Sequence, residues 1–245
     1  MRILLLSDLH IEQGDPDFEL DLDAFDIAFI CGDVSDNAKW TVRYIHKFVE
    51  KVIKNKPYKF IPGNHDHWGN ILSNSRYFFN QLSGHTPRKV VEFMGERILS
   101  CTLWYRPEDN AIKKDWSDYW CITDWPALRM EHDKDIEFLQ KELREGDIVM
   151  THMLPCMEAV TPKWIGHECN KYYVVDVSNL IQERKPKLWC MGHSHEAMFK
   201  QYESTWLARN PLGYRGENRF FNLWIIDTAK LGQYDAVEVI SLNKE

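Results

Sequence analysis

The 245-residue sequence predicts an α/β fold in which mixed β-sheets carry their helices on the outside. The first half alternates short apolar runs with segments of helical periodicity, which is the pattern of βαβ units. The second half is rich in short strands. We see no internal repeat, low-complexity tract or linker, so we expect a single domain over residues 1–245.

Composition narrows the classes of partner. Hydrophobic residues make up 44% of the chain and charged residues 27%, which is ordinary globular usage. The net charge is -7 and no lysine or arginine block exceeds two residues, so the chain has no basic footprint for duplex nucleic acid or an anionic membrane. The apolar run at 3–6 is too short for a signal peptide and lacks a cleavage site. No other run approaches the roughly 18 apolar residues of a membrane span.

The cysteines indicate a reducing compartment. They are scattered along the chain without a C-x-x-C pair, and several lie in apolar runs. We interpret them as reduced, buried thiols of a cytoplasmic protein rather than disulfides or zinc ligands. The six positions are Cys31, Cys101, Cys121, Cys156, Cys169 and Cys190.

The first half of the chain supplies three buried strands and a covering helix. The central strand is the apolar run over 27–31, which stops at Gly32, where the backbone can turn sharply. Apolar residues at helical spacing over 38–54 predict a helix capped by Asp36 or Asn37. The other expected elements are strands over 2–6 and 58–61, a helix over 70–82, and paired strands over 88–94 and 97–103.

The second half contains two segments without clear periodicity. Residues 104–125 are aromatic and charged, and form either a substrate-contacting region over the site or a packed surface excursion. Residues 155–170 form a long loop, which is a candidate lid. The expected elements are helices over 131–144 and 173–183, strands over 147–150, 187–191, 197–202, 205–208, 220–226 and 235–241, and a turn over 210–214.

Polar side chains with ligand chemistry follow five of the predicted strands. Parallel strands end at one edge of a sheet, where ligands of α/β proteins usually bind. Asp8 and His10 are two residues apart, so in extended backbone both can face one point. His46 lies beside the apolar stripe of its helix and is interpreted as structural, and His67 as a bystander on its loop. The candidate set is Asp8, His10, Asp33, Asn64, His65, Asp66, His152, His193 and His195.

Such a mixed set of nitrogen and oxygen ligands suits Mn²⁺, Fe or Zn²⁺, and its size indicates two cations rather than one. Asp33 is the natural bridge because a carboxylate can bind two metals. Two divalent ions roughly 3.5–4 Å apart can hold a phosphate oxygen and an activated hydroxide in line, which is the logic of many phosphoesterases.

The order of these motifs resembles the calcineurin-like metallophosphoesterase superfamily. The motifs are D-x-H at 8–10, G-D-x-x-D at 32–36, G-N-H-D at 63–66, a single histidine at 152 and G-H-x-H at 192–195. The resemblance implies a four-layer α/β/β/α sandwich of two mixed sheets flanked by helices, the metallo-dependent phosphatase-like fold. It also implies roles for the candidates: Asp8, His10 and His195 on one metal, Asn64, His152 and His193 on the other, Asp33 between them, His65 facing the leaving group, and Asp66 orienting His65.

The motif variants suggest a small substrate. Protein phosphatases of the superfamily read G-D-x-x-D-R-G and R-G-N-H-E, whereas here Asn37 follows Asp36, and Asp66 stands in place of glutamate. The G-N-H-D form, the small size and the absence of extra domains resemble the bacterial phosphodiesterases of the superfamily. This resemblance implies a phosphodiesterase with two divalent ions, most simply Mn²⁺, that cleaves a small or nucleotide-type phosphate ester by attack of metal-bound hydroxide. The alternatives are a phosphomonoesterase on the same site and a non-catalytic metal-binding scaffold. Oligomeric state stays open.

Overall fold

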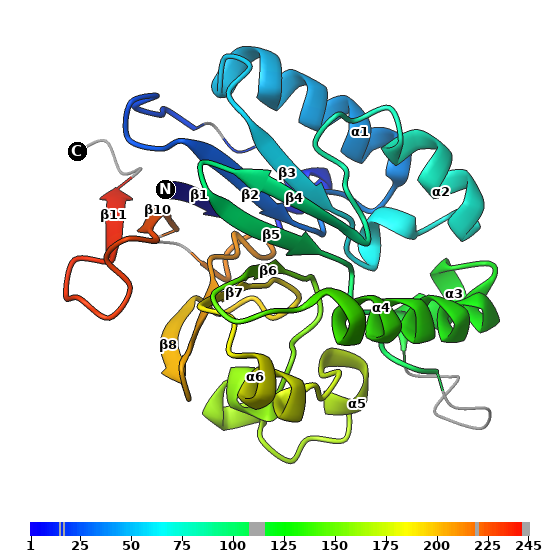
Figure 1. Ribbon diagram of the computed structural model, residues 1–245. Helices are drawn as coiled ribbons and strands as arrows, with labels where there is room; N and C mark the ends of the chain where they lie inside the picture. The colour runs from blue at the N-terminus through cyan, green and yellow to red at the C-terminus, as the bar shows by residue number, and fades with distance from the viewer. Residues whose placement is uncertain (15, 17, 108–115, 219–220, 242–245) are drawn as a thin grey trace.

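Two mixed β-sheets lie face to face, and helices cover their outer faces, which gives four layers in the order α/β/β/α (Figure 1). The computed structural model describes residues 1–14, 16, 18–107, 116–218 and 221–241. The layer order confirms the fold class predicted from the sequence.

The first sheet has three parallel strands beside an antiparallel pair. It is built from β1 (Arg2–Leu6), β2 (Ile27–Cys31), β3 (Tyr58–Ile61), β10 (Asn222–Asp227) and β11 (Val237–Ser241). Their order is β11-β10-β1-β2-β3. Because β1, β2 and β3 are parallel, their carboxyl ends lie along one edge of the sheet.

The second sheet also combines parallel and antiparallel strands, with one antiparallel strand at each edge. Its strands are β4 (Lys89–Phe93), β5 (Glu96–Ser100), β6 (Ile148–Met150), β7 (Leu188–Cys190), β8 (Met198–Tyr202) and β9 (Thr205–Arg209). They follow the order β4-β5-β6-β7-β9-β8, with β5, β6, β7 and β9 parallel. The carboxyl ends of β6 and β7 therefore lie side by side, as those of β1 and β2 do.

Helices cover both outer faces (Figure 1). Helices α1 (Ala38–Lys47) and α2 (Leu72–Phe79) lie on the side of the first sheet, and α4 (Leu128–Glu142), α5 (Asn170–Tyr173) and α6 (Ser178–Arg184) on the side of the second. A short helix, α3 (Ser117–Cys121), precedes α4. Of the two predicted caps of α1, the structure uses Asn37, whose side chain accepts the Lys39 N–H.

Alternation along the strands fills the three interfaces between these layers. In β1, Leu5 packs between the sheets, whereas Leu4 faces the helices of the first sheet. In β6, Ile148 packs between the sheets and Val149 faces the opposite helical layer. All four side chains are fully buried, and each contributes about 1.5–3 kcal/mol through burial. The apolar runs seen in the sequence are therefore strands buried on both faces.

The helix predicted over 173–183 is shorter than expected. Helix α6 begins at Ser178 because the preceding residues bond to Leu154 and Pro155 instead of continuing the helix. The Val175 N–H donates to the carbonyl of Leu154, and Val174 forms a bridge with the same residue. These bonds hold residues 174–177 next to Leu154 and Pro155.

Other boundaries also differ from prediction. The helix expected over 38–54 is α-helical only to Lys47 and continues as a π-helical turn over Phe48–Val52. Helix α4 starts at Leu128, three residues before the predicted 131, because the 3₁₀ turn with Pro126 leads directly into it. Residues 108–115 of the 104–125 segment, and residue 220 of the strand predicted over 220–226, lie outside the described residues.

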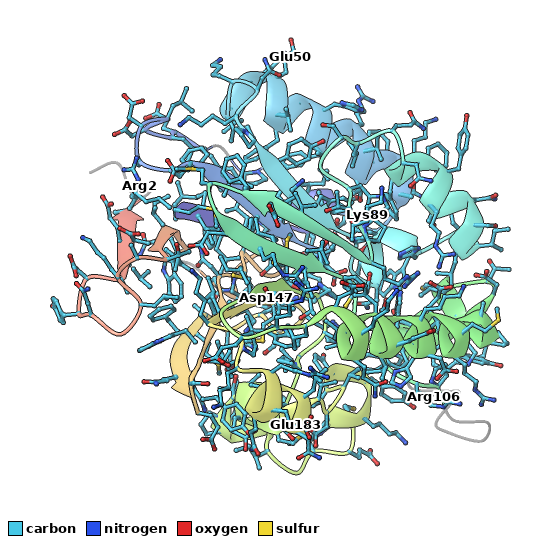
Figure 2. All side chains as sticks on the ribbon, viewed as in Figure 1. Arg2, Glu50, Lys89, Arg106, Asp147 and Glu183 are labelled. Carbon is cyan, nitrogen blue, oxygen red and sulfur yellow. The ribbon has the colours of Figure 1, made fainter. Side chains whose placement is uncertain are left out.

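Charged side chains lie at the periphery. Glu50, Lys89 and Glu183 are exposed and point outward (Figure 2). Within the described ranges, no helix has the length and apolarity needed to cross a bilayer.

The two histidines set aside in the sequence differ in environment. His46 is exposed on α1. His67 is buried with its ring edge-on to Phe79 and Trp104, at centroid distances of 5.2 and 5.3 Å. Burial, together with Arg76, lowers the pKa of His67 to about 3, so this imidazole is neutral and packs as a core aromatic.

Candidate active site

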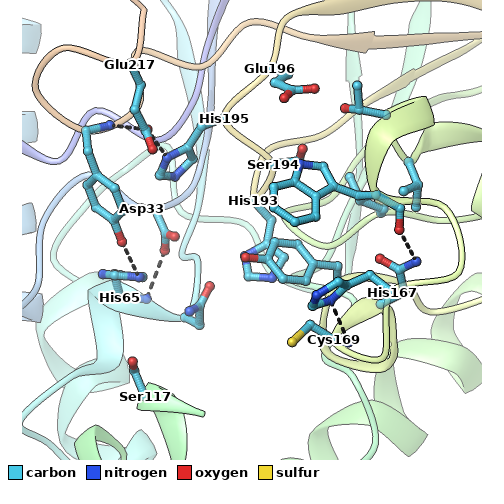
Figure 3. A pocket seen from close by; sticks show the side chains of 18 of the residues that line it. Asp33, His65, Ser117, His167, Cys169, His193, Ser194, His195, Glu196 and Glu217 are labelled. Atoms are coloured by element: carbon cyan, nitrogen blue, oxygen red, sulfur yellow. Dashed lines mark hydrogen bonds and ion pairs between the residues drawn. The ribbon is translucent and has the colours of Figure 1, made fainter. Parts of the chain in front are cut away.

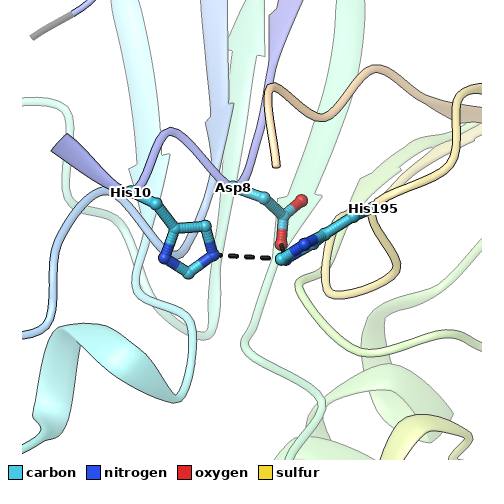
Figure 4. Close-up of side chains that lie close together, drawn as sticks. All are labelled: Asp8, His10 and His195. Atoms are coloured by element: carbon cyan, nitrogen blue, oxygen red, sulfur yellow. Dashed lines mark hydrogen bonds and ion pairs between the residues drawn. The ribbon is translucent and has the colours of Figure 1, made fainter. Parts of the chain in front are cut away.

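The residues predicted at five strand ends converge on one edge of the two sheets. Among the described residues, three sets of three side chains each bring one potential ligand atom per residue within 4.8 Å of the others, and the third set, His10, Asp36 and His65, shares His10 with the first. Asp8, His10 and His195 make the first group (Figure 4). Asp33, His152 and His193 make the second.

In the first group, two imidazole nitrogens face each other. His10 Nε2 lies 3.2 Å from His195 Nε2, which in turn lies 3.8 Å from Asp8 Oδ1. The opposite ring nitrogens donate to carboxylates: His10 Nδ1 to Glu12 at 3.1 Å and His195 Nδ1 to Glu217 at 2.6 Å. A carboxylate accepts only, so each Nδ1 carries the proton and each Nε2 is left to bind a cation.

In the second group, the Nδ1 atom of a histidine is again held by a hydrogen bond. His152 Nδ1 donates to the carbonyl of Cys31 at 2.8 Å. Its Nε2 lies 3.0 Å from Asn64 Oδ1 and 3.2 Å from Asp33 Oδ2. Three atoms with lone pairs thus converge on one point, which places the predicted ligand Asn64 in this group as well.

Two further observations fit a cation at each group. Asp8 Oδ2 and His193 Nε2 are buried without a hydrogen-bond partner among the described residues, which is costly unless something else binds them. In addition, Asp8, His10, Asp33 and His193 have φ angles of 50°, 43°, 52° and 68°. Such left-handed backbone in non-glycine residues is strained and concentrates at functional sites.

Glycines allow the strand ends to approach this closely. A Cβ on Gly63 would collide with Asp33 Oδ1 and the His152 ring. A Cβ on Gly192 would lie 2.6 Å from the Cys31 carbonyl and 2.9 Å from Asp8 Oδ2. The glycines of the G-N-H-D and G-H-x-H motifs are therefore required by contact between the two sheets' edges.

His65 is held by a residue other than the one predicted. Its Nδ1 lies 2.6 Å from Asp36 Oδ1, and its Nε2 lies 3.3 Å from the Tyr214 hydroxyl. The Trp68 indole stacks on the ring at a centroid distance of 3.6 Å. The expectation that Asp66 orients this imidazole is wrong, because Asp36 occupies that place.

The Asp66 carboxylate is taken up by the backbone. It accepts the N–H groups of Asp33, Val34 and Gly63 at 2.8–3.1 Å, and also the Thr41 hydroxyl. Burial, followed by repulsion from Asp33, raises its pKa to about 7. Asp66 thus joins the loops after β2 and β3 and fixes the position of Asp33 rather than that of His65.

The electrostatics favour an ionised Asp33. Burial alone would raise the pKa of Asp33, but His152 and His65 lower it well below its usual value. Burial opposes the charge of His65, but Asp33 and the hydrogen bond to Asp36 outweigh it and raise its pKa to about 9. At neutral pH, His65 therefore carries a proton that it can donate from Nε2.

A buried carboxylate that the sequence did not reveal organises one side of the site. Asp118, only 1% exposed, accepts Asn64 Nδ2 at 2.9 Å and Trp68 Nε1 at 2.7 Å through Oδ1. Through Oδ2 it accepts the Tyr105 hydroxyl and Trp116 Nε1, both at 3.0 Å. Because Asp118 takes the amide N–H of Asn64, the amide oxygen is turned toward the second group.

The two groups open into a cavity of about 630 Å³. Asp33, His65 and His195 lie at one end, whereas His167 and Cys169 of the 155–170 segment lie at the other (Figure 3). The segment that the sequence suggested as a lid therefore forms a wall of the cavity. Of the 104–125 segment, Trp116 to Asp118 line the cavity, whereas Tyr105 is buried in the core.

Sequence reasoning missed several residues of the site. Asp36 was within reach, because it ends the G-D-x-x-D motif, although it was read only as a helix cap. Asp118, Tyr214 and Glu217 carried no signal, since none lies at a strand end or at motif spacing from its partner.

Comparison with known families decides the class of protein. The profile described as calcineurin-like phosphoesterase matches residues 1–197. The chain belongs to this family. It is a hydrolase that acts on phosphate esters, in a family that uses divalent metals. The match confirms the resemblance drawn from the motifs, all of which lie within the matched range.

Known relatives of this calcineurin-like phosphoesterase are distant in sequence. An uncharacterised protein of Acanthamoeba polyphaga mimivirus is 24% identical, over 91% of this chain and 95% of that protein. The solved structure of phosphopantetheinyl hydrolase from Mycobacterium tuberculosis has a TM-score of 0.66 and 14% identity, covering 98% of this chain and 96% of that one. GAP50, the anchor in the inner membrane complex of Plasmodium, has a TM-score of 0.55 and 11% identity, covering 100% and 90%. These structural likenesses establish a shared fold.

Proposed function

We propose that this calcineurin-like phosphoesterase is a two-metal phosphodiesterase that cleaves a small or nucleotide-type ester. The observation that carries the proposal is the pair of ligand groups at one sheet edge, with His65 beside them. Mn²⁺ is the expected ion, and Fe or Zn²⁺ suit the same ligands. A cytoplasmic location and a single domain over 1–245 remain predictions.

Each group would hold one cation. Asp8, His10 and His195 would bind the first, and His152, His193 and Asn64 the second. Asp33 would bind both, because a carboxylate has two oxygens that can each take a cation. Its Oδ2 faces His152 of the second group at 3.2 Å, whereas Oδ1 accepts the backbone N–H of His65 at 2.9 Å. When bound, the ions would supply Lewis acidity to the phosphoryl oxygens and to the attacking water.

His65 would protonate the leaving oxygen. Asp36 holds its Nδ1 proton, so Nε2 points into the cavity with the second proton of the imidazolium. The hydroxyl of Tyr214 lies close enough to Nε2 to direct that proton. Neither a serine nor a cysteine nucleophile is needed, because the attacking group is water.

The shape and charge of the cavity favour a diester over a monoester. About 630 Å³ accommodates two organic arms as well as a phosphate. Among the described residues that line it, Lys163 is the only lysine or arginine, and its ammonium is paired with Glu196. A dianionic monoester would gain more from a free arginine than a monoanionic diester does.

A non-catalytic role is the remaining alternative. GAP50 shows that a protein of this fold can be an anchor. Here the predicted ligands converge on one sheet edge. Two of their buried atoms, Asp8 Oδ2 and His193 Nε2, lack hydrogen-bond partners among the described residues, which favours a working metal site over a scaffold.

The proposal is tested by comparing hydrolysis of bis(p-nitrophenyl) phosphate with that of p-nitrophenyl phosphate, with Mn²⁺ and with a chelator. We expect diester-preferring turnover that the chelator abolishes. A monoester preference would replace the proposal with the phosphatase alternative. Two bound metals without turnover of either ester would favour the scaffold.

Asp118→Asn should weaken the second metal site. An asparagine offers one acceptor oxygen where the carboxylate offers two, so two buried donors lose their partner, at roughly 1–3 kcal/mol each. Because Asn64 is then free to turn its amide, we expect Mn²⁺ affinity at that site to fall roughly 10- to 100-fold. The measurement is a Mn²⁺ titration by calorimetry, alongside urea unfolding in chelator.

Asp133→Asn is the matched control, because Asp133 is more than half exposed on α4 and pairs only with Arg106 in the contacts described. It should leave both metal affinities unchanged. If Asp118→Asn lowers stability but keeps normal metal affinity, Asp118 is only structural and does not orient Asn64.

A further inference from the structure

We infer that the cavity wall formed by Trp116, Tyr173 and the 155–170 segment is a binding site for an uncharged, planar aromatic arm of the substrate. The inference rests on the proposed function, since it names the class of ester that the site would cleave. It is drawn from the rings, charges and fixed geometry of this wall, none of which takes part in the chemistry above.

Aromatic side chains line the cavity from the metal ligands outward. Tyr173 lies against the candidate ligand His193 at a ring-centroid distance of 4.3 Å, and Trp116 lies 5.5 Å from Tyr173. Farther out, Trp164 lines the same cavity and remains 46% exposed. An exposed indole at the mouth of a pocket offers a face that a flat ligand can cover.

The wall is preformed. Asp118 accepts the Trp116 Nε1 proton, and Tyr172 stacks on the Trp116 indole at 4.5 Å with 15° between the ring planes. Trp164 closes a 3₁₀ turn, its carbonyl accepts the Asn170 side-chain N–H at 2.8 Å, and its indole packs edge-on with the His167 ring at a centroid distance of 5.4 Å. Rings held in place by their own contacts lose little entropy when a ligand stacks on them.

Charge excludes a second anionic group at this wall. The ammonium of Lys163 is already paired with Glu196, and its distance from the Trp164 ring centroid is 5.4 Å. The other carboxylates that line the cavity belong to Asp33, Asp118 and Glu217. A second phosphate would be repelled by these carboxylates, whereas a neutral ring would not.

The test uses phosphonates, which the esterase cannot hydrolyse and which carry the same head group. Methylphosphonate, cyclohexylphosphonate and phenylphosphonate are titrated into the Mn²⁺-loaded protein by calorimetry. We expect phenylphosphonate to bind roughly 5- to 150-fold more tightly than methylphosphonate, as one stacked ring contributes. Cyclohexylphosphonate should lie between them, and 1,4-phenylenebis(phosphonate) should bind more weakly than phenylphosphonate.

Two variants locate the site. Trp164→Ala should lower the phenyl-to-methyl affinity ratio about fivefold or more, and Trp164→Phe should restore most of it. Trp40→Ala is the control, because Trp40 is also an exposed indole, 56% exposed, but lies on α1 outside the cavity. It should leave the ratio unchanged.

The outcomes separate this inference from the proposed function. Equal binding of the three monophosphonates, with normal diester hydrolysis, overturns the aromatic site alone. Tight cyclohexylphosphonate binding equal to that of phenylphosphonate replaces it with a general apolar site. Phenyl selectivity without hydrolysis of any ester overturns the esterase assignment instead, and failure to bind any phosphonate together with no hydrolysis of either ester overturns both.

Discussion

Asp33→Asn should abolish phosphodiester hydrolysis and reduce the metal content to one ion or none. The Asp33 carboxylate lies 3.2 Å from His152 in the second ligand group, and the nearby His152 and His65 lower its pKa against the effect of burial, so it is ionised. An amide offers one oxygen and no charge, so it cannot bridge two cations. Loss of the several kcal/mol that a bridged pair of ions supplies corresponds to a fall in kcat of roughly a thousandfold or more.

The measurement is metal content per chain by elemental analysis, with initial rates on bis(p-nitrophenyl) phosphate. Asp133→Asn again serves as the control, since it removes a carboxylate charge from the exposed face of α4. Two ions per chain together with normal turnover in Asp33→Asn would rule out the bridging role.

His65→Ala should leave both metals bound but lose turnover, most severely for poor leaving groups. The imidazole has its Nδ1 held by Asp36 and its Nε2 beside Tyr214, and it belongs to neither of the proposed metal groups. A general acid contributes roughly 10²- to 10⁴-fold. An alkoxide leaving group needs that proton, whereas p-nitrophenolate leaves readily without it.

The comparison is therefore between a p-nitrophenyl diester and an alkyl diester on the same variant, with metal content measured in parallel. His46→Ala, on the exposed face of α1, controls for removal of an imidazole. If His65→Ala also strips metal from the protein, His65 is a ligand and its assignment as the acid is wrong. An equal loss for both esters would instead indicate a role in binding.

Much of the site was predictable because the strands are. The apolar runs over 27–31 and 58–61 are buried strands as expected, and parallel pairing alone aligns their carboxyl ends. Every candidate at those ends therefore reached the predicted edge, and the glycines of the motifs proved to be needed where the two sheets touch. Helix ends were less predictable. Helix α6 starts later than expected because Val174 forms a β-bridge with Leu154 instead of joining the helix.

The error at His65 shows where sequence proximity misleads. Asp66 is its neighbour in the chain, but five backbone and side-chain donors bind the Asp66 carboxylate. Asp36, which follows a different strand, has its carboxylate free to reach the ring. The partner of a side chain is set by the packing of the whole fold, so it need not be the adjacent residue in the sequence.

By itself, the sequence determined the α/β class, the edge at which the site lies and the chemistry of its candidate metal ligands, because strand periodicity and strand-end motifs are local properties. Only the tertiary structure decided which carboxylate holds His65, that Asp118 orients Asn64, and that aromatic rings from 104–125 and 155–170 form one wall. Asp36 and His65 are 29 positions apart in the chain, and Asn64 and Asp118 are 54 apart. No spacing or periodicity encodes contacts at such separations. Only the packing of the two sheets and their loops brings these residues together.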